Sequence, residues 1–441
     1  MNEFLEKIKL ILNDEFDDFL KCYEGENFRG LRVNTLKTSF EELNKIIGFD
    51  LKKTPFCKNG AYIPENIKSL GNNPLHHSGA FYIQEPSATS AVTMLNVQKG
   101  DRVLDLCAAP GGKSTQIAAD LMGTGFLWSN EIVKNRANIL LSNIERMGVK
   151  NAVVSSCYPE SLCSKLSGFF DKVLVDAPCS GEGMFRKDSQ AEKEWSVEHV
   201  KSCAERQLQI LNSAKKALKP NGVMVYSTCT FSKEENEQVI EKFLDENPDF
   251  VLEEPDVSFG RRTMDYAVRI FPMDGGEGHF AAKLRKKSEG EPVYYSAETE
   301  NIHKKDKENI VAFFKDILYN DEILENLKVI NNKIYAIPRS MPAVQGLQIL
   351  RGGVLLGEIK KNRIEPSHHL FMSLKKDEVR QYADFDVNSQ EILRFLHGEE
   401  IEVDSGLKGY TAVCVNGITT GFGKASNGKL KNKYPKGLRI L

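Results

Sequence analysis

The stretch RVLDLCAAPGGKSTQIAADL (residues 102–121) determines the fold class of this chain. Its short apolar run passes through a glycine pair into a helical pattern, which is typical of a β-strand followed by a crossover helix. Similar apolar segments follow, separated by longer amphipathic stretches: FLWSNE (126–131), AVVSSC (152–157), KVLVDAP (172–178) and VMVYSTC (223–229). Strands that alternate with helices predict βαβ units and a parallel sheet, so we expect an α/β fold.

The sequence on either side of this unit predicts further parts. Near the N-terminus, apolar residues at helical spacing precede a strand-like and a helical segment: Phe4, Ile8, Leu12 and Phe16, then LRVNTLK (31–37) and SFEELNKIIGF (39–49). After a last strand, HFAAKLRK (279–286), the chain becomes polar and charged, and helical and β-like segments with glycine-rich turns follow. We therefore expect a small N-terminal α/β domain (1–75), the central domain (76–288), a linker (289–310) and a mixed α/β C-terminal region (311–441).

Composition excludes several classes of protein. The 441 residues are 27% charged and 41% hydrophobic, which is typical of globular chains and not of disordered ones. With 59 Lys and Arg against 61 Asp and Glu, the net charge is −2, so a nucleic-acid-binding surface would have to be local. Nine cysteines without a CxxC pair argue against a disulfide framework or structural zinc. Because no apolar run is long enough to span a bilayer, we expect a cytoplasmic protein without a membrane partner.

Chemically useful residues follow the ends of the predicted strands. Asp105 ends the first strand, Glu131 follows the second, Asp176 and Cys179 follow the fourth, and Cys229 ends the fifth. The carboxyl ends of parallel strands share one edge of the sheet, where ligands bind. We therefore expect these residues to converge on one crevice.

The first loop predicts a nucleotide-type ligand there. Gly111 and Gly112 can expose backbone N–H groups at a helix start. A P-loop would need glycine where Cys107 stands, and the GxGxxG fingerprint is absent, which argues against an ATPase and a dehydrogenase. Glu131 is suited to bind both ribose hydroxyls of an adenosine-type cofactor, and an exposed loop acid without a ligand is the alternative.

Two cysteines stand beside this crevice. Cys179 lies in a proline-containing turn, and Cys229 precedes Ser232 and Glu235, which have the spacing of a capping box. A helix starting there would favour a Cys229 thiolate through its dipole. A cysteine in an apolar strand is usually a small buried hydrophobe, but two at adjacent strand ends favour function. We interpret the other seven cysteines as small buried hydrophobic residues without a chemical role.

With these motifs the chain resembles a known family, the NOP/Sun family of S-adenosylmethionine-dependent RNA cytosine-5 methyltransferases. Within that family it resembles the RsmF type, which acts on 16S ribosomal RNA. The resemblance covers nearly the whole chain and rests on motifs in the family's order: LRVNTLK, YIQEPSATSAV (82–92), LDLCAAPGGKSTQIA, SNE (129–131), VDAPCSGEGMFRKD, YSTCTFSKEENE, RIFPMDGGEGHFAAKL (269–284), LRGGVLLGEIKKNRIEPSHHL and KNKYPKGLR.

The resemblance implies a Rossmann-like class I methyltransferase domain and a C-terminal PUA-like RNA-binding module. It implies that the cofactor is held by Ala108, Pro110, Gly111, Gly112, Lys113, Glu131, Arg136 and Asp176. Cys229 matches the nucleophile of the Thr-Cys motif, and Cys179 matches the Pro-Cys cysteine that assists product release. Many relatives carry an acid near the adenine where this chain reads SSCYPES (155–161), so we assign no side chain to that contact.

Cytosine C5 is a weak nucleophile, and addition of a thiolate to C6 would activate it. Asp176, if a dry site kept it protonated, could donate a hydrogen bond to N3. The target base must also leave its stack, which is easier in single-stranded RNA.

The C-terminal residues are locally basic. No acid occurs between residues 421 and 441, which contain Lys424, Lys429, Lys431, Lys433, Lys436 and Arg439. Arg351, Lys360, Lys361 and Arg363 add to this charge and favour contact with RNA phosphates over a merely solvated surface.

Three functions agree with these patterns. We expect a monomeric enzyme that methylates small-subunit ribosomal RNA without a metal. A transfer RNA cytosine-5 methyltransferase and a catalytically inactive ribosome-assembly factor are the alternatives.

Overall fold

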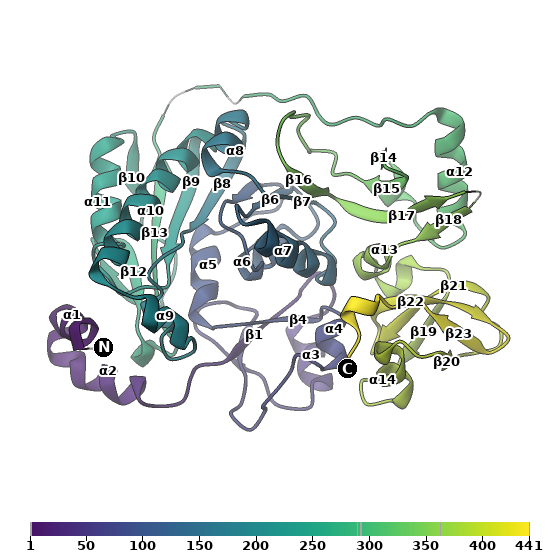
Figure 1. Cartoon of the computed structure of the whole chain (residues 1–441), viewed down its shortest axis with the longest axis horizontal. Helices are drawn as coiled ribbons and strands as arrows, with labels where there is room; N and C mark the ends of the chain where they lie inside the picture. The colour runs from purple at the N-terminus through teal and green to yellow at the C-terminus, as the bar shows by residue number, and fades with distance from the viewer. Residues whose placement is uncertain (1, 289, 292, 362, 441) are drawn as a thin grey trace.

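The structure is a computed structural model that describes residues 2–288, 290–291, 293–361 and 363–440. Four β-sheets follow one another along the chain (Figure 1). A four-stranded sheet lies near the N-terminus, a ten-stranded sheet forms the centre, and sheets of four and five strands form the C-terminal region.

The central sheet contains all five predicted strands: β5 (Arg102–Asp105), β6 (Phe126–Asn130), β7 (Ala152–Ser155), β8 (Phe170–Asp176) and β9 (Leu218–Thr228). They pair in parallel in the order β7-β6-β5-β8-β9, which confirms the α/β prediction. Antiparallel strands extend the sheet beyond β9: β13 (His279–Lys286), with β10 (Phe250–Leu252), β12 (Ala267–Ile270) and β11 (Arg261–Thr263). The order of the strands reverses at β5, so a crevice opens at the carboxyl ends of β5 and its neighbours.

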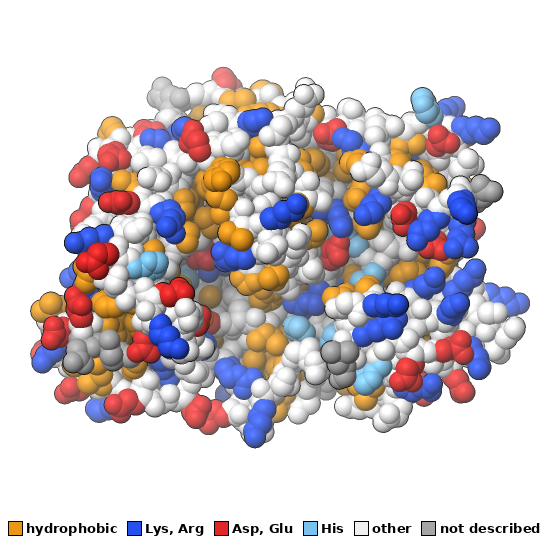
Figure 2. All heavy atoms as spheres, in the orientation of Figure 1, with side chains coloured by type: hydrophobic (Ala, Val, Ile, Leu, Met, Phe, Trp, Pro, Cys, Tyr) orange, Lys and Arg blue, Asp and Glu red, His pale blue; other side chains and the backbone are white. Residues whose placement is uncertain are grey.

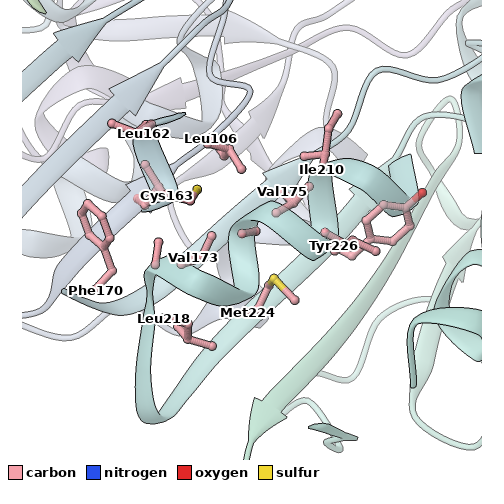
Figure 3. Packing of buried hydrophobic residues seen from close by; sticks show 14 of the residues in the cluster. Leu106, Leu162, Cys163, Phe170, Val173, Val175, Ile210, Leu218, Met224 and Tyr226 are labelled. Atoms are coloured by element: carbon pink, nitrogen blue, oxygen red, sulfur yellow. The ribbon is translucent and has the colours of Figure 1, made fainter. Parts of the chain in front are cut away.

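Two apolar layers cover the central sheet. Neighbouring strand residues point to opposite faces: Val173 and Val175 pack in one layer and Leu174 in the other. The first layer is completed by α8 (Pro159–Lys165), α10 (Val197–Ala217) and α11 (Glu237–Glu246), as Figure 3 shows for part of the cluster. The second layer is completed by α5 (Ser90–Leu95), α6 (Gly112–Leu121) and α7 (Lys134–Arg146).

The N-terminal sheet has the order β2-β3-β1-β4. Its strands are β1 (Gly30–Val33), β2 (Lys52–Lys53), β3 (Gly60–Tyr62) and β4 (Phe81–Gln84), with α3 (Phe40–Ile46) and α4 (Pro74–His77) beside them. The predicted strand and helix are β1 and α3. Because β4 belongs to this sheet, the N-terminal part reaches beyond residue 75, the predicted boundary.

The first two helices, α1 (Asn2–Leu12) and α2 (Phe16–Tyr23), pack away from the N-terminal sheet. Their buried Phe4 and Phe19 belong to one apolar cluster with Phe185, Phe231 and Phe271 of the central domain. This packing places the start of the chain against the loops that follow β8 and β9.

The C-terminal region begins with α12 (Lys304–Lys315), inside the segment predicted as a linker. Its four-stranded sheet comprises β14 (Leu327–Ile330), β15 (Lys333–Ala336), β17 (Val354–Lys360) and β18 (Arg363–Pro366). After α13 (His368–Ser373), the five-stranded sheet comprises β19 (Tyr382–Phe385), β20 (Ile401–Glu402), β21 (Gly409–Val415), β22 (Ile418–Ser426) and β23 (Lys429–Asn432), with α14 (Gln390–His397).

One C-terminal strand joins the central sheet. β16 (Ile349–Gly352) pairs antiparallel with the edge strand β7. Beside it, Arg351 bonds Glu145 at 2.5 Å and approaches His369 at 3.1 Å. The prediction that Arg351 contributes to an RNA-binding surface is therefore wrong, because the Arg351 guanidinium forms an ion pair with Glu145 within the protein.

Candidate active site

The two cysteines at the ends of adjacent strands meet in space. Cys179 follows β8, Cys229 follows β9, and their sulfur atoms lie 3.3 Å apart although fifty residues separate them. The backbone N–H of Gly183 donates to the carbonyl oxygen of Cys229 at 2.8 Å, which ties the two loops together. The predicted convergence of the sulfurs is confirmed. Contact with Cys229, followed by burial, raises the pKa of the Cys179 thiol well above its ordinary value.

Asp176 occupies the same edge of the sheet as one half of an ion pair. Lys113 Nζ lies 2.7 Å from its Oδ2, and Ser227 Oγ donates to its Oδ1 at 2.8 Å. Burial is the largest influence and acts to raise the pKa of Asp176, but Lys113, His279 and the Ser227 hydroxyl together outweigh it, so the pKa lies below its usual value. The carboxylate is ionised at neutral pH, so the condition for a hydrogen bond from Asp176 to N3, a protonated carboxyl group, is not met. The sequence does not reveal this, because Lys113 comes from a different loop.

His279, at the start of β13, is a site residue that sequence reasoning missed. It is buried, and its Nε2 lies 4.0 Å from Asp176 Oδ1. Burial lowers the pKa of His279 to about 3, so the ring is neutral at physiological pH. Neither ring nitrogen has a hydrogen-bond partner among the described residues. Its position in the motif GGEGHF was the only available signal.

A cavity of about 220 Å³ lies between the glycine loop and the N-terminal sheet. It is lined by residues predicted to hold the cofactor and by residues of β4 that were not predicted: Ala108, Pro110, Gly112, Lys113 and Asp176, with Tyr82, Ile83 and Gln84. A Cβ atom at Gly112 would approach Tyr82 and Gln84 to 3.3 Å, and Gly111 has φ +117°, which favours glycine. The glycines therefore keep this cradle open for a ligand.

Glu131 and Arg136 lie together beside the same loop. Only 4% of the Glu131 side chain surface is exposed, and Arg136 Nη1 lies 3.3 Å from its Oε2. Arg136 also donates to the carbonyl oxygen of Ala109 at 3.1 Å. Glu131 is thus a buried acid linked to the cofactor loop through Arg136, which fits the ribose-binding interpretation better than that of an exposed loop acid. Together with the glycine cradle, these residues fit an adenosine-type cofactor.

The loop after β7, which lacks the expected acid, contacts the C-terminal region. Ser156 N donates to the carbonyl oxygen of Gln348 at 2.9 Å, and Gln348 N donates to Cys157 Sγ at 3.3 Å. The residues just before β16 therefore form one wall beside the cofactor loops.

The helix after Cys229 differs from its prediction. Helix α11 begins at Glu237 with Asn236 as its N-cap, so it starts well beyond Cys229. The Ser232 hydroxyl donates to Glu234, and the Glu235 side chain binds Ser180. The capping box and the dipole account of the Cys229 thiolate are both wrong, because Glu235 has a stronger set of donors in another loop.

The predicted basic residues of the C-terminus lie in β22, in β23 and after it. Five of them are exposed lysines: Lys424, Lys429, Lys431, Lys433 and Lys436. Figure 2 shows Lys and Arg side chains gathered over this part of the molecule. Arg439 is partly buried, while Lys360 and Arg363 both pair with Glu365. Lys429 Nζ also lies 3.4 Å from Glu400 Oε1, whereas Lys424, Lys431, Lys433 and Lys436 have no ion-pair partner within the described residues and offer the freer charge.

Asp105 lies below the cofactor loop, and we expect it to make the free energy of unfolding depend on pH. It is fully buried, Ser114 Oγ donates to it at 2.7 Å, and burial raises its pKa to about 7. A raised folded-state pKa gives stability that is complete below the unfolded value near 3.8 and is lost as the pH rises through 7. We expect Asp105→Asn to increase the free energy of unfolding at pH 8 by roughly 2 kcal/mol, and to change it little at pH 4. Urea unfolding at both pH values measures this; an equal effect at each pH would contradict it.

Family models match most of the chain. The model of 16S rRNA methyltransferase RsmB/F matches residues 92–285, and that of the N-terminal domain of 16S rRNA methyltransferase RsmF matches residues 1–86. The RsmF rRNA methyltransferase first C-terminal domain matches 312–374, and the methyltransferase RsmF PUA domain matches 382–440. The chain is 35% identical to the ribosomal RNA small subunit methyltransferase F of Vibrio vulnificus, over 99% of this chain and 96% of that protein. The chain belongs to the RsmF family.

A second member of the RsmF family, from Aliivibrio fischeri, is 33% identical over 96% of this chain and 93% of its own length. A methyltransferase homologue from Pyrococcus horikoshii has a similar structure, with 30% identity and a TM-score of 0.55, over 62% of this chain and 90% of that one. The structure of NSun6 from the same organism, solved with SFG, shares the fold at a TM-score of 0.59 and 24% identity, over 66% of this chain and 99% of its own.

These comparisons confirm the predicted family, the Rossmann-like methyltransferase fold, the PUA domain and the dependence on S-adenosylmethionine. In the described part of the chain, no helix is long and apolar enough to cross a membrane.

Proposed function

We propose that this member of the RsmF family methylates C5 of one or more cytosines in 16S ribosomal RNA, with Cys229 as a covalent nucleophile. The observation that carries the proposal is the contact of the Cys179 and Cys229 sulfurs at the sheet edge that also holds the Lys113–Asp176 pair. Family membership supports the ribosomal substrate.

The cofactor residues present fit the proposed methyl donor. Glu131 would hold the ribose, with Arg136 fixing the orientation of Glu131. The rest would be surrounded by Ala108, Pro110, Gly112 and Lys113, which line the cavity, and by the neighbouring Gly111. Bound S-adenosylmethionine supplies an electrophilic methyl group. This chain must then make C5 of the base nucleophilic.

Lys113 and Asp176 can select cytosine. Their ion pair presents an acceptor and a donor side by side, which matches the N4 amino donor and the neighbouring acceptors N3 and O2 of cytosine. Uracil carries an acceptor at position 4 and a donor at N3, so the contacts to these two positions would be mismatched, while O2 is an acceptor in both bases. The Lys113 ammonium also lies where it can stabilise the negative charge that develops on N3 and O2.

Cys229 forms the covalent bond to the base at the start of the reaction and leaves it at the end. Its thiolate would add to C6, which makes the C5–C6 electron pair available at C5. C5 would then bond the methyl group, and the bond between the methyl group and the donor sulfur would break with its electron pair left on that sulfur. For release, the C5–H electron pair reforms the C5–C6 double bond and the C6–S bond breaks. As the C6–S bond breaks, Cys179 gives its proton to the departing sulfur, and the Cys179 thiolate formed in this way accepts the proton that leaves C5. A thiol with a raised pKa, in contact with the Cys229 sulfur, suits this task.

The exposed lysines of the PUA domain would hold the RNA backbone. We expect replacement of Lys431, Lys433 and Lys436 by glutamine to weaken RNA binding and to reduce the slope of log K against log salt by about 2, since each phosphate contact contributes roughly 0.7 to 0.9. Filter binding at several salt concentrations measures this. Replacing the exposed Lys242, Lys304 and Lys305, which lie on α11 and α12, provides the control. Equal slopes for both triple variants would make the C-terminal lysines an ordinary solvated surface.

The proposal is tested by incubating the protein with 16S ribosomal RNA, small ribosomal subunits or transfer RNA and methyl-labelled S-adenosylmethionine. Label in 16S RNA, mapped to cytosine by bisulfite sequencing, supports it. Label only in transfer RNA favours that substrate, and RNA binding without label favours an assembly factor. We further propose that the protein acts in the cytoplasm, where ribosomes are assembled, and as a monomer, which light scattering can check.

A further inference from the structure

Two buried glutamates lie in the loops that carry the cysteines. Glu182 belongs to the loop that follows Cys179, and Glu235 belongs to the loop that follows Cys229. Glu235 is completely buried, and only 2% of Glu182 is exposed. The mechanism proposed above uses neither of them.

Each carboxylate binds the loop of the other cysteine. Glu235 Oε2 accepts from the backbone N–H of Ser180, the residue after Cys179, at 2.9 Å, and its Oε1 accepts from the Ser180 hydroxyl. Glu182 Oε2 accepts from the backbone N–H of Phe231, two residues after Cys229, at 2.9 Å. The contacts are therefore crossed.

The second partners of the two glutamates are also neutral donors. Gln207 Nε2 donates to Glu235 at 2.8 Å, and Trp195 Nε1 donates to Glu182 at 2.9 Å. Burial raises the pKa of both carboxyl groups. Among the residues that the structure describes, neither carboxylate has an ion-pair partner. A buried acid without one costs stability compared with an apolar side chain, so packing alone does not account for these residues.

We propose that Glu182 and Glu235 are positioning residues, and that their crossed hydrogen bonds hold the two active-site sulfurs in contact. Glu235, from the loop of the nucleophile, places Cys179. Glu182, from the loop of the helper, places Cys229. This inference rests on the two-thiol function proposed above and adds to it the residues that set the sulfur geometry.

The crossed arrangement predicts crossed phenotypes. Loss of Glu235 frees the Cys179 loop, so methyl transfer continues while release of the RNA fails. We expect Glu235→Ala to accumulate a covalent RNA–protein adduct about tenfold above the wild-type level. Loss of Glu182 frees the Cys229 loop, so Glu182→Ala is expected to lower kcat/KM for methylation about tenfold without an adduct.

The experiment measures the adduct on denaturing gels and initial methylation rates, with 16S ribosomal RNA and S-adenosylmethionine. Glu235→Gln and Glu182→Gln accompany the alanine variants, because they keep one acceptor oxygen and the side-chain shape if alanine prevents folding; smaller effects in the same crossed directions are expected. Glu234→Gln is the matched control: Glu234 lies in the Cys229 loop, but its bonds go to Lys7 and to Ser232 of its own loop, and among the described residues it makes no bond to the Cys179 loop. Its rates and adduct level are expected to match the wild type.

An uncrossed pattern, in which Glu182 variants accumulate adduct, would overturn the inference. Parallel loss of rate and adduct in all four variants, tracking a lower melting temperature, would also overturn it, because a purely structural role gives that result. Cys179→Ala is run beside them. If it forms no adduct, the two-thiol function itself fails; if it forms an adduct and Glu235→Ala does not, only the positioning inference fails.

Discussion

Replacing Cys229 by alanine is expected to abolish methyl transfer, with a loss of roughly 10³-fold or more in kcat, as for other covalent nucleophiles. The reason is chemical. Without addition of a thiolate to C6, C5 of cytosine has too little electron density to attack the methyl donor. Incorporation of methyl label into 16S ribosomal RNA measures the rate.

The Cys229→Ala variant should still fold and bind its ligands. The cysteine side chain is small, and the Cys229 backbone carbonyl keeps its bond from Gly183. S-adenosylhomocysteine and RNA are therefore expected to bind as they do to the wild type. A variant that methylates at the wild-type rate would remove Cys229 from its role as nucleophile.

Replacing Cys179 by alanine is expected to have the opposite signature. The base is methylated, but the C6–S bond persists, because the thiol that contacts the Cys229 sulfur at 3.3 Å is gone. The protein should then migrate with bound RNA on a denaturing gel after a single turnover, while multiple turnover falls by about 10²-fold or more.

The control for this prediction is the double variant Cys179→Ala with Cys229→Ala, which has no nucleophile and should show no shifted band. Digestion with ribonuclease should return the single variant to its normal mobility. A Cys179→Ala protein that turns over repeatedly without a shifted band would show that release needs no second thiol.

The parallel strands were predictable because their signals are local. An apolar run of four to seven residues, a turn and an amphipathic helix recur from Arg102 to Cys229, and hydrophobic periodicity alone identifies them. The convergence of Cys179 and Cys229 followed from the same pattern, since parallel strands end at one edge. β16 was not predictable as part of this sheet: pairing between residues 349–352 and 153–155 depends on the path of nearly two hundred intervening residues.

The chemical state of the site was less predictable than its position. Asp176 is ionised because Lys113 reaches it from another loop, and His279 is neutral because it is buried. Glu235 has the spacing of a helix cap, yet its carboxylate turns to Ser180. Each of these depends on distances between segments remote in sequence, which no local pattern encodes.

The most direct test of the account is to identify the residue that bonds to RNA. Cys179→Ala protein is incubated with 16S ribosomal RNA and S-adenosylmethionine, digested with ribonuclease and trypsin, and examined by mass spectrometry. We predict a methylated cytidine nucleotide attached to the sulfur of Cys229. A nucleotide attached to a different residue, or methylated RNA formed by a protein that lacks Cys229, would contradict the account.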